Sequence, residues 1–384
     1  MPTLPDFRLE TYFARWEFTA RYHLTASDAE TMPMAELLDL ADDDGRQRWE
    51  SLALGYTETR GLSALREEIA RTYETLQPQD VLCFAGAEEA IYLAMHVLLD
   101  PGDHAVVLTP NYQAAETIPL SMCEVTGVPL RPEDGWALDV EAIEAALRPG
   151  TRLVSVNFPN NPTGAVPDPA AWRLLVELCT ERGITLFSDE VYRGLELDRT
   201  PLPQAADLSP TAISLNVMSK AYGLPGLRIG WVACRDRRLL DRLERAKHYT
   251  TICNSAPSEV LALIGLRARE VLLDRNRRIV ADNLPQFAGF FDRFSGLFAW
   301  EPPQGGCVCF PRYLGPDGVE AMCADLVEQA GVLLLPASIY RSELTQVPAD
   351  RFRVGVGRRG ADDALAQWSD WLEKRGSTPP SSNL

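Results

Sequence analysis

The sequence between residues 80 and 235 alternates helical patterns with short apolar runs, and this alternation constrains the fold more than any other feature. In AEEAIYLAMHVLL, the side chains of Ile91, Met95 and Leu98 share one helical face, and the following run HAVVLTP is typical of a buried strand. Strands that alternate with helices predict a mostly parallel sheet covered by helices on both faces. We therefore expect a three-layer α/β/α fold. Ligands in such sheets bind at the carboxyl ends of the strands, so the polar residues there are candidates for a site.

A second, smaller lobe is indicated by a change of pattern after Cys234, where the charged helix DRRLLDRLERAKHY begins. From about residue 275 the chain mixes helices with short strands such as GGCVCFPRY and FRVGVG. We expect a large domain formed by residues 40–275. A smaller, discontinuous α+β domain is expected from residues 1–39 and 276–384.

Charge and hydropathy exclude several classes of partner. The net charge of −17 disfavours binding to nucleic acid or to an anionic membrane. No apolar run reaches the roughly 20 residues that span a bilayer, and the start MPTLPDFRLE lacks the features of a secretory signal. We expect a cytoplasmic protein. Its eight cysteines are scattered, and the one-residue gap between Cys307 and Cys309 is not zinc-finger spacing, so no metal site is expected.

The segment MSKAYGLPGLRIGW, residues 218–231, places Lys220 at the end of an apolar run and Arg228 eight residues later, across a turn rich in glycine and proline. A lysine in this position can condense with an aldehyde. The arginine can bind a phosphate through two parallel hydrogen bonds. The alternative is a surface loop with two solvated cations.

The segment SDEVY, residues 188–192, ends an apolar strand with Asp189. A carboxylate there is costly to bury unless it is paired, and a pyridinium nitrogen is a suitable partner because the aspartate keeps the ring protonated. Tyr192 lies three residues after Asp189 in the same segment. In the segment NFPNNPTG, Asn161 offers an amide to a phenolate-type oxygen. The alternatives are an exposed acidic strand end and a simple turn.

These motifs occur in a fixed order: Asn161, Asp189 28 residues later, Lys220 after a further 31 and Arg228 after a further 8. In N-P-T-G, S-D-E-V-Y and S-K-x-x-G-L-P-G-L-R-x-G-W, the chain resembles the class I/II aminotransferases of pyridoxal-5'-phosphate (PLP) fold type I. The resemblance covers nearly the whole chain. It implies the PLP-dependent transferase fold, with PLP held on Lys220 as a Schiff base and with Asp189 and Tyr192 acting beside it.

The resemblance implies further cofactor contacts. FAGAEEA looks like the family's phosphate loop, in which Gly86, Ala87 and Glu88 precede a helix whose N–H groups face the phosphate. Tyr112 resembles the aromatic residue that stacks on the cofactor ring. Tyr56, in GYTETRG, resembles the tyrosine that reaches the phosphate of the neighbouring subunit, which implies a homodimer with shared active sites.

Arg353, in RFRVGVG, resembles the arginine that binds the substrate α-carboxylate, and Asn161 belongs to the same expected substrate site. Arg351 is the alternative, because alternation along a strand places both on one face. One position departs from the family. Where many members have serine or threonine three residues before the lysine, this chain has Val217, and Ser219 is the nearby hydroxyl.

The function implied by this resemblance is transfer of an amino group between an L-amino acid and a 2-oxo acid. Two alternatives remain. The same fold also catalyses elimination, cyclisation and related reactions, and the N-terminal stretch YFARWEFTARYHLTASDAE is similar to that of members that process unusual amino acids. A non-catalytic PLP-fold sensor would need a DNA-binding segment, for which the chain has neither the room nor the charge.

Overall fold

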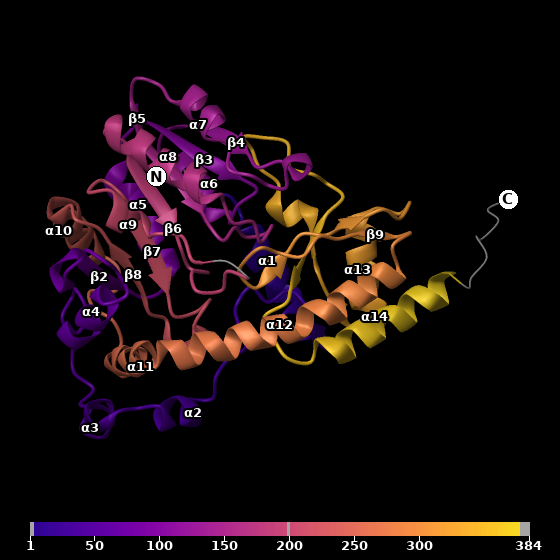
Figure 1. The fold of residues 1–384 in the computed structure, drawn as a ribbon, viewed down its shortest axis with the longest axis horizontal. Coiled ribbons are helices and arrows are strands. Elements are labelled where there is room, and N and C mark those ends of the chain that lie inside the picture. Colours follow the sequence, from indigo (N-terminus) through magenta and orange to yellow (C-terminus); the bar gives the residue numbers. More distant parts are fainter. Residues whose placement is uncertain (1–3, 198–199, 377–384) are drawn as a thin grey trace.

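A computed structural model describes residues 4–197 and 200–376 of the protein, and a seven-stranded sheet forms the centre of its larger part (Figure 1). The strand order is β2-β8-β7-β6-β5-β3-β4; β8 runs antiparallel to both its neighbours, and the other pairs are parallel. The strands are β2 (Val81–Phe84), β3 (His104–Thr109), β4 (Glu124–Pro129), β5 (Thr151–Asn157), β6 (Thr185–Asp189), β7 (Ile213–Val217) and β8 (Gly230–Ala233). The mostly parallel sheet predicted from the sequence is confirmed.

Helices pack on both faces of the sheet, because strands such as β3 are buried along their whole length and need apolar cover on each side. One face is covered by α4 (Ser63–Ala70), α5 (Ala87–Leu98), α6 (Ala114–Leu120), α10 (Arg237–Lys247) and α11 (Ala256–Arg267). The other is covered by α7 (Val140–Ala146), α8 (Pro169–Glu181) and α9 (Ala205–Leu208). Local signals set the ends of α8: the Asp168 carboxylate accepts hydrogen bonds from the first backbone N–H groups, and Gly183 follows with φ 65°.

A second lobe is built around the long helix α12 (Arg269–Arg293), which runs beside α14 (Ala361–Gly376) in Figure 1. Its other elements are β9 (Phe298–Ala299), β10 (Val308–Cys309), β11 (Arg312–Tyr313), α13 (Val319–Ala330), β12 (Val332–Leu333), β13 (Leu335–Pro336) and β14 (Phe352–Gly355). Strand β1 (Tyr22–His23) pairs with β12, and Leu24 joins the apolar cluster of this lobe. The N-terminal segment therefore packs here, while the predicted domain boundaries stay a prediction; residues 377–384 lie outside the described part.

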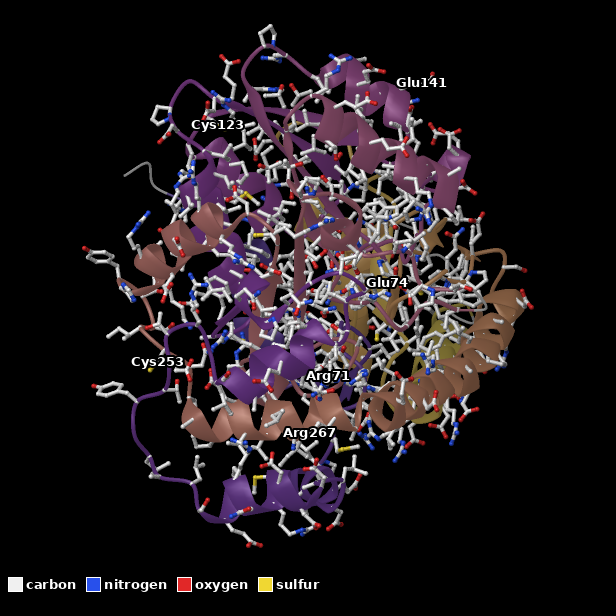
Figure 2. All side chains as sticks on the ribbon, turned by 60° about the vertical axis from the view of Figure 1, so that its left-hand side comes forward. Arg71, Glu74, Cys123, Glu141, Cys253 and Arg267 are labelled. Carbon is white, nitrogen blue, oxygen red and sulfur yellow. The ribbon has the colours of Figure 1, made fainter. Side chains whose placement is uncertain are left out.

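A segment that carries α2 (Met34–Asp39) and α3 (Asp43–Glu50) projects from the body at the foot of Figure 1. Arg267 of α11, labelled in Figure 2, joins this segment to the body: it donates hydrogen bonds to both carboxylate oxygens of Asp42, at 2.9 and 3.0 Å, and to Asp44 at 2.9 Å. The irregular stretch after α3 lies beside the loop after α10, where the Thr57 hydroxyl donates to the carbonyl of Asn254 at 3.1 Å. Both stretches lie at the margin of the molecule, close to the labelled Cys253 in Figure 2.

Short 3-10 helices complete the chain: η1 (Pro78–Asp80), η2 (Pro132–Asp134), η3 (Pro225–Leu227) and η4 (Ala337–Tyr340). Among the described residues, none of the helices combines the length and the apolar character that crossing a bilayer requires.

Candidate active site

A cavity of about 410 Å³ lies where the parallel strands β5, β6 and β7 end, with their terminal residues Asn157, Asp189 and Val217 in its wall. Parallel strands end at one edge of a sheet, so three segments distant in sequence meet here. The N-terminal helix α1 (Arg8–Trp16) and the chain after it form the opposite wall. The predicted residues that line the cavity are Ala87, Glu88, Tyr112, Asn161, Asp189, Tyr192, Ser219, Lys220 and Arg228.

Lys220 lies three residues beyond the end of β7, and its Nζ donates a hydrogen bond to the hydroxyl of Ser27 at 2.8 Å. Burial lowers the pKa of the Lys220 ammonium, an effect that nearby Asp28 opposes. The chain has only two other lysines. Lys247 is fully buried elsewhere, where its Nζ donates to backbone and side-chain oxygens, and Lys374 lies on α14. Lys220 is therefore the lysine amine at this cavity.

Asp189 ends β6 inside the cavity wall. One of its carboxylate oxygens accepts from the backbone N–H of Val191 at 3.2 Å, while the Asn157 amide donates to its backbone carbonyl at 3.1 Å. Burial raises the pKa of the Asp189 carboxyl to about 6. A cationic partner would stabilise the charged form of a carboxylate buried in this position, and a protonated ring nitrogen would be such a partner.

The start of α5 and Arg228 form a cradle. Gly86 caps the helix with φ 95°, and a Cβ added there would come within 2.6 Å of the Arg228 Nη2. Only glycine permits this approach without strain. The Arg228 Nη1 also reaches the Ser219 hydroxyl at 3.4 Å. Helix N–H groups together with a guanidinium are suited to a phosphate.

Glu88, in the first turn of α5, adds an acidic group to the same wall. Burial, together with the neighbouring charges of Glu10 and Asp189, raises the pKa of the Glu88 carboxyl to about 7. Tyr112 lies beside Glu88, and its ring stands 5.2 Å from that of Phe7 between centroids.

Tyr192 is 1% exposed and lines the cavity. Its hydroxyl lies close to Ser27 but makes no hydrogen bond with any residue of the described chain. A buried hydroxyl without a partner in a cavity wall marks a place where a ligand oxygen would be accommodated. The sequence analysis predicted that Tyr192 acts beside Lys220 and Asp189, and the structure places all three in the lining of one cavity.

Arg353 is fully buried on β14 and connects to the cavity through Asn161. Its Nη1 donates to the Asn161 Oδ1 at 3.2 Å and to the Tyr340 hydroxyl at 2.6 Å, whereas its Nε has no partner among the described residues. The alternative, Arg351, donates instead to the carbonyl of Phe310 at 2.8 Å and is only half buried. The two arginines thus have different surroundings: Arg353 lies within β14, whereas Arg351 precedes that strand.

Tyr56 does not line this cavity: it is 93% exposed on the irregular stretch after α3. Leu54 on the same stretch and Tyr249 on the neighbouring loop are 85% and 92% exposed. The structure of one chain therefore separates Tyr56 from the other predicted residues.

Several residues of the N-terminal wall were not predicted. Ser27 and Asp28 line the cavity, and Arg358 binds both oxygens of Asp28 at 2.9 Å each. Glu10 and Glu17 line it from α1 and its end. In the sequence, only the unusual stretch YFARWEFTARYHLTASDAE pointed to this part of the site. The spacing of its residues does not show which of their side chains face a cavity. Within residues 4–197 and 200–376, no cluster of three or more His, Cys, Asp or Glu side chains could hold a metal.

Comparisons with known proteins agree with this geometry. Residues 28–367 match the model of the family described as "Aminotransferase class I and II". Capreomycidine synthase from Streptomyces vinaceus is 30% identical over 354 residues, which cover 92% of this chain and 89% of that protein.

Two solved structures are also similar. A PLP-dependent aminotransferase from Streptococcus suis 89-1591 superposes with a TM-score of 0.89 at 29% identity, covering 97% of this chain and 98% of that one. The PLP-dependent cyclase OrfR superposes with a TM-score of 0.87 at 26% identity, covering 98% and 99% of the two chains.

Proposed function

The chain belongs to the class I and II aminotransferase family, and we propose that it moves an amino group between an L-amino acid and a 2-oxo acid. It is an enzyme of this family, has PLP fold type I, and its cofactor is PLP. The observation that carries the proposal is the meeting of the Lys220 amine and the Asp189 carboxylate in one cavity, beside the unpartnered Tyr192 hydroxyl.

The residues present fit the cofactor. The Gly86–Ala87 backbone and Arg228 suit its phosphate, since a side chain at Gly86 would fill that cradle. Asp189 suits the ring nitrogen, because that carboxylate is buried and has no cationic partner at hydrogen-bonding distance among the described residues.

The remaining groups of the cofactor also have suitable partners among the residues that line the cavity. Tyr192 and Asn161 suit its phenolic oxygen, Tyr112 its face, and Lys220 its aldehyde. The Ser219 hydroxyl and the backbone N–H of Glu88, in the first turn of α5, complete the phosphate side. When bound, PLP supplies an electron sink for the negative charge that develops at the substrate Cα.

Lys220 is proposed as the general base that takes the proton from Cα and returns it. Its lowered pKa favours the neutral amine, which is the form that accepts a proton. Ser27 accepts a hydrogen bond from Lys220 and so directs its Nζ. The amine is thus held where burial keeps it reactive.

Arg353 is proposed to bind the substrate α-carboxylate, with Asn161 beside it. The free Nε and the two hydrogen bonds through Nη1 support this role, because an entering carboxylate would give the guanidinium a full-charge acceptor in place of neutral oxygens.

We further propose a homodimer, in the cytoplasm, in which Tyr56 serves the phosphate of the other subunit. The exposed Leu54, Tyr56 and Tyr249 support an interface at this margin, since large side chains that protrude into water gain from burial.

A second candidate is cyclisation or elimination on the same carbanion. The similarity to capreomycidine synthase over most of both chains and to a PLP-dependent cyclase favours it. Both reactions need the same base and the same electron sink. They differ in the fate of the amino group, which transamination passes to a 2-oxo acid.

The test is product analysis. The purified holoenzyme is incubated with a panel of L-amino acids, with and without 2-oxoglutarate or pyruvate. Transamination requires the 2-oxo acid and yields glutamate or alanine together with a new 2-oxo acid. A product that forms without any 2-oxo acid, through loss of ammonia or water or through ring closure, would replace transamination by the second candidate.

A further inference from the structure

The turn that carries Lys220 is tied to its surroundings by main-chain hydrogen bonds. The Lys220 carbonyl accepts from the N–H groups of Ala29, at 3.2 Å, and of Gly223, at 3.1 Å. The N–H of Ala221 donates to the carbonyl of Val191 at 3.3 Å. These three distances lie at or beyond the long end of the usual range for N–H···O bonds, so a shorter bond to the same turn would contribute more to its position.

Asn276 on α12 makes such a bond. Its side chain is fully buried, and its Nδ2 donates to the carbonyl of Ala221, the residue after Lys220, at 2.8 Å. Gly223 in the same turn has φ 68°, and a Cβ there would come within 2.6 Å of the Glu30 carbonyl oxygen and 3.1 Å of the Asn276 Nδ2. Only a glycine lets the turn, α12 and the N-terminal segment approach so closely.

Arg275, the neighbour of Asn276 on α12, binds the segment of the N-terminal wall. Its Nη1 donates to the carbonyl of Glu30 at 2.7 Å and to the Asn276 Oδ1 at 2.9 Å. Its Nη2 donates to the carbonyl of Thr31 at 3.1 Å. Glu30 and Thr31 follow Ser27 by three and four residues. One guanidinium and one amide therefore join the segment of Ser27 to the turn of Lys220.

The two segments meet inside the cavity at one side-chain contact, the hydrogen bond of 2.8 Å from the Lys220 Nζ to the Ser27 hydroxyl. Arg275 and Asn276 are not among the described residues that line the cavity. They lie on α12, which begins beside α11 and runs into the second lobe (Figure 1). The distance between the amine and its acceptor therefore depends on two residues outside the cavity. Because a displacement of about 1 Å at a reacting group lowers rates strongly, this distance matters for the reaction.

We propose that Arg275 and Asn276 are positioning residues for the reaction, which hold the turn of Lys220 and the segment of Ser27 at the separation where these two side chains meet. An asparagine suits this place because its amide donates to one group and accepts from another at the same time. An apolar side chain would leave the buried Ala221 carbonyl without this donor. The inference rests on one part of the proposed function, PLP held on Lys220, and on no particular reaction at the substrate Cα.

The test is a double-mutant cycle on the holoenzyme with Asn276→Leu and Ser27→Ala. The absorption of PLP bound to Lys220 depends on whether the Schiff-base nitrogen carries a proton, so a pH titration without substrate gives the pKa of that nitrogen. Ser27 accepts a hydrogen bond from the Lys220 Nζ and so favours its protonated form; loss or displacement of this acceptor lowers the pKa. We expect each single substitution to lower the pKa by about 0.4–1 pH unit, the equivalent of one hydrogen bond.

In the double variant, we expect the pKa to be no lower than in the lower single variant, because both substitutions act through the same contact. Substitutions that act independently would add their shifts. Neither substitution removes any of the charged or titratable groups around Lys220, which are Asp28, Arg353, Cys307 and Asp189.

Gln204→Leu is the matched control. Gln204 is also buried, and its amide donates to a main-chain carbonyl, that of Thr72, at the same distance of 2.8 Å. It is not among the described residues that line the cavity. This substitution should lower the temperature of unfolding, as Asn276→Leu does, but should leave the pKa of the Schiff-base nitrogen unchanged.

Arg275→Met is a second variant of the positioning pair, at a residue that is only half buried. It removes the bonds to Glu30 and Thr31 and leaves the bond from Asn276 to Ala221. It should therefore lower the pKa by less than Asn276→Leu, again without adding to Ser27→Ala, and it carries the test if Asn276→Leu does not fold.

The outcomes separate this inference from the proposed function. Additive shifts in the double variant, an unchanged pKa in Asn276→Leu or an equal shift in Gln204→Leu would overturn the positioning role. An unchanged pKa in Arg275→Met, or full additivity with Ser27→Ala, would do the same. Coupled shifts in an enzyme that forms only ring-closed or elimination products would support the positioning role and contradict transamination. Borohydride fixation of the cofactor to a different lysine would overturn both.

Discussion

The two walls of the cavity differ in how firmly the fold fixes them. On the sheet wall, Asp189 and Asn157 end neighbouring parallel strands, and the Asn157 amide donates a hydrogen bond to the backbone carbonyl of Asp189. On the N-terminal wall, Glu10 is exposed on the nine-residue helix α1, and Glu17, just after that helix, is half exposed. Hydrogen bonds to the carbonyls of Arg341 and Leu334 join this helix to the second lobe.

This difference indicates that the two walls have different roles in the reaction. Groups that must act on Cα need a fixed geometry, which a buried sheet edge provides. We therefore expect substitutions on the sheet wall to abolish the reaction, and a substitution on the N-terminal wall to have a smaller effect on its rate.

The largest effect is expected for Lys220→Ala. Removing the only lysine amine of the cavity should lower turnover by at least about 10²–10⁴-fold, the usual contribution of a general base. Borohydride reduction of the wild type followed by peptide mass spectrometry should place the pyridoxyl group on Lys220. Finding it on Lys247 or Lys374 would contradict the assignment of the site.

The next effect is expected for Asp189→Asn, which keeps the shape and removes the negative charge. The cofactor nitrogen should lose its proton, so the rate of Cα deprotonation should fall by about two orders of magnitude or more. Loss of the Cα hydrogen to deuterated solvent, followed by NMR, measures this step directly. Near-normal exchange would show that the sheet wall does not act through this carboxylate.

A moderate effect is expected for Val217→Ser. Val217 lies in the cavity wall at the end of β7 and offers no hydrogen-bond donor. A serine there should tighten PLP binding, by up to about tenfold, because a charge-assisted hydrogen bond contributes about 1.5–3 kcal/mol and a small cavity offsets part of it. Equilibrium dialysis gives the dissociation constant. Unchanged binding would mean that position 217 does not meet the phosphate.

The smallest effect is expected for Ser27→Ala. Ser27 is the residue of the N-terminal wall that accepts a hydrogen bond from Lys220. Losing one hydrogen bond should lower kcat by about three- to tenfold. The acceptor favours charged Lys220, so its removal should lower the amine's pKa further and shift the acidic limb of the pH–rate profile to lower pH. An unshifted profile would leave Ser27 as a purely structural residue and would sharpen the contrast between the walls.

The sequence alone determined the parts of the protein that local chemistry specifies. Alternating patterns predicted the covered parallel sheet, and strand-end motifs identified Lys220, Asp189, Asn161 and Arg228, which the structure gathers at one cavity. These residues could be predicted because each lies within a few positions of a strand end or turn that short-range signals mark, and parallel strands end at a common edge.

Only the tertiary structure determined which residues form the N-terminal wall of the cavity and what they contact. Ser27 meets Lys220 across 193 positions of chain, Asp28 meets Arg358 across 330, and Tyr340 meets Asn161 across 179. Periodicity and spacing describe neighbours along the chain, whereas these contacts depend on how the N-terminal segment packs through β1 and α1 against the second lobe. For the same physical reason, only the folded structure shows that Glu10 and Glu17 line the cavity.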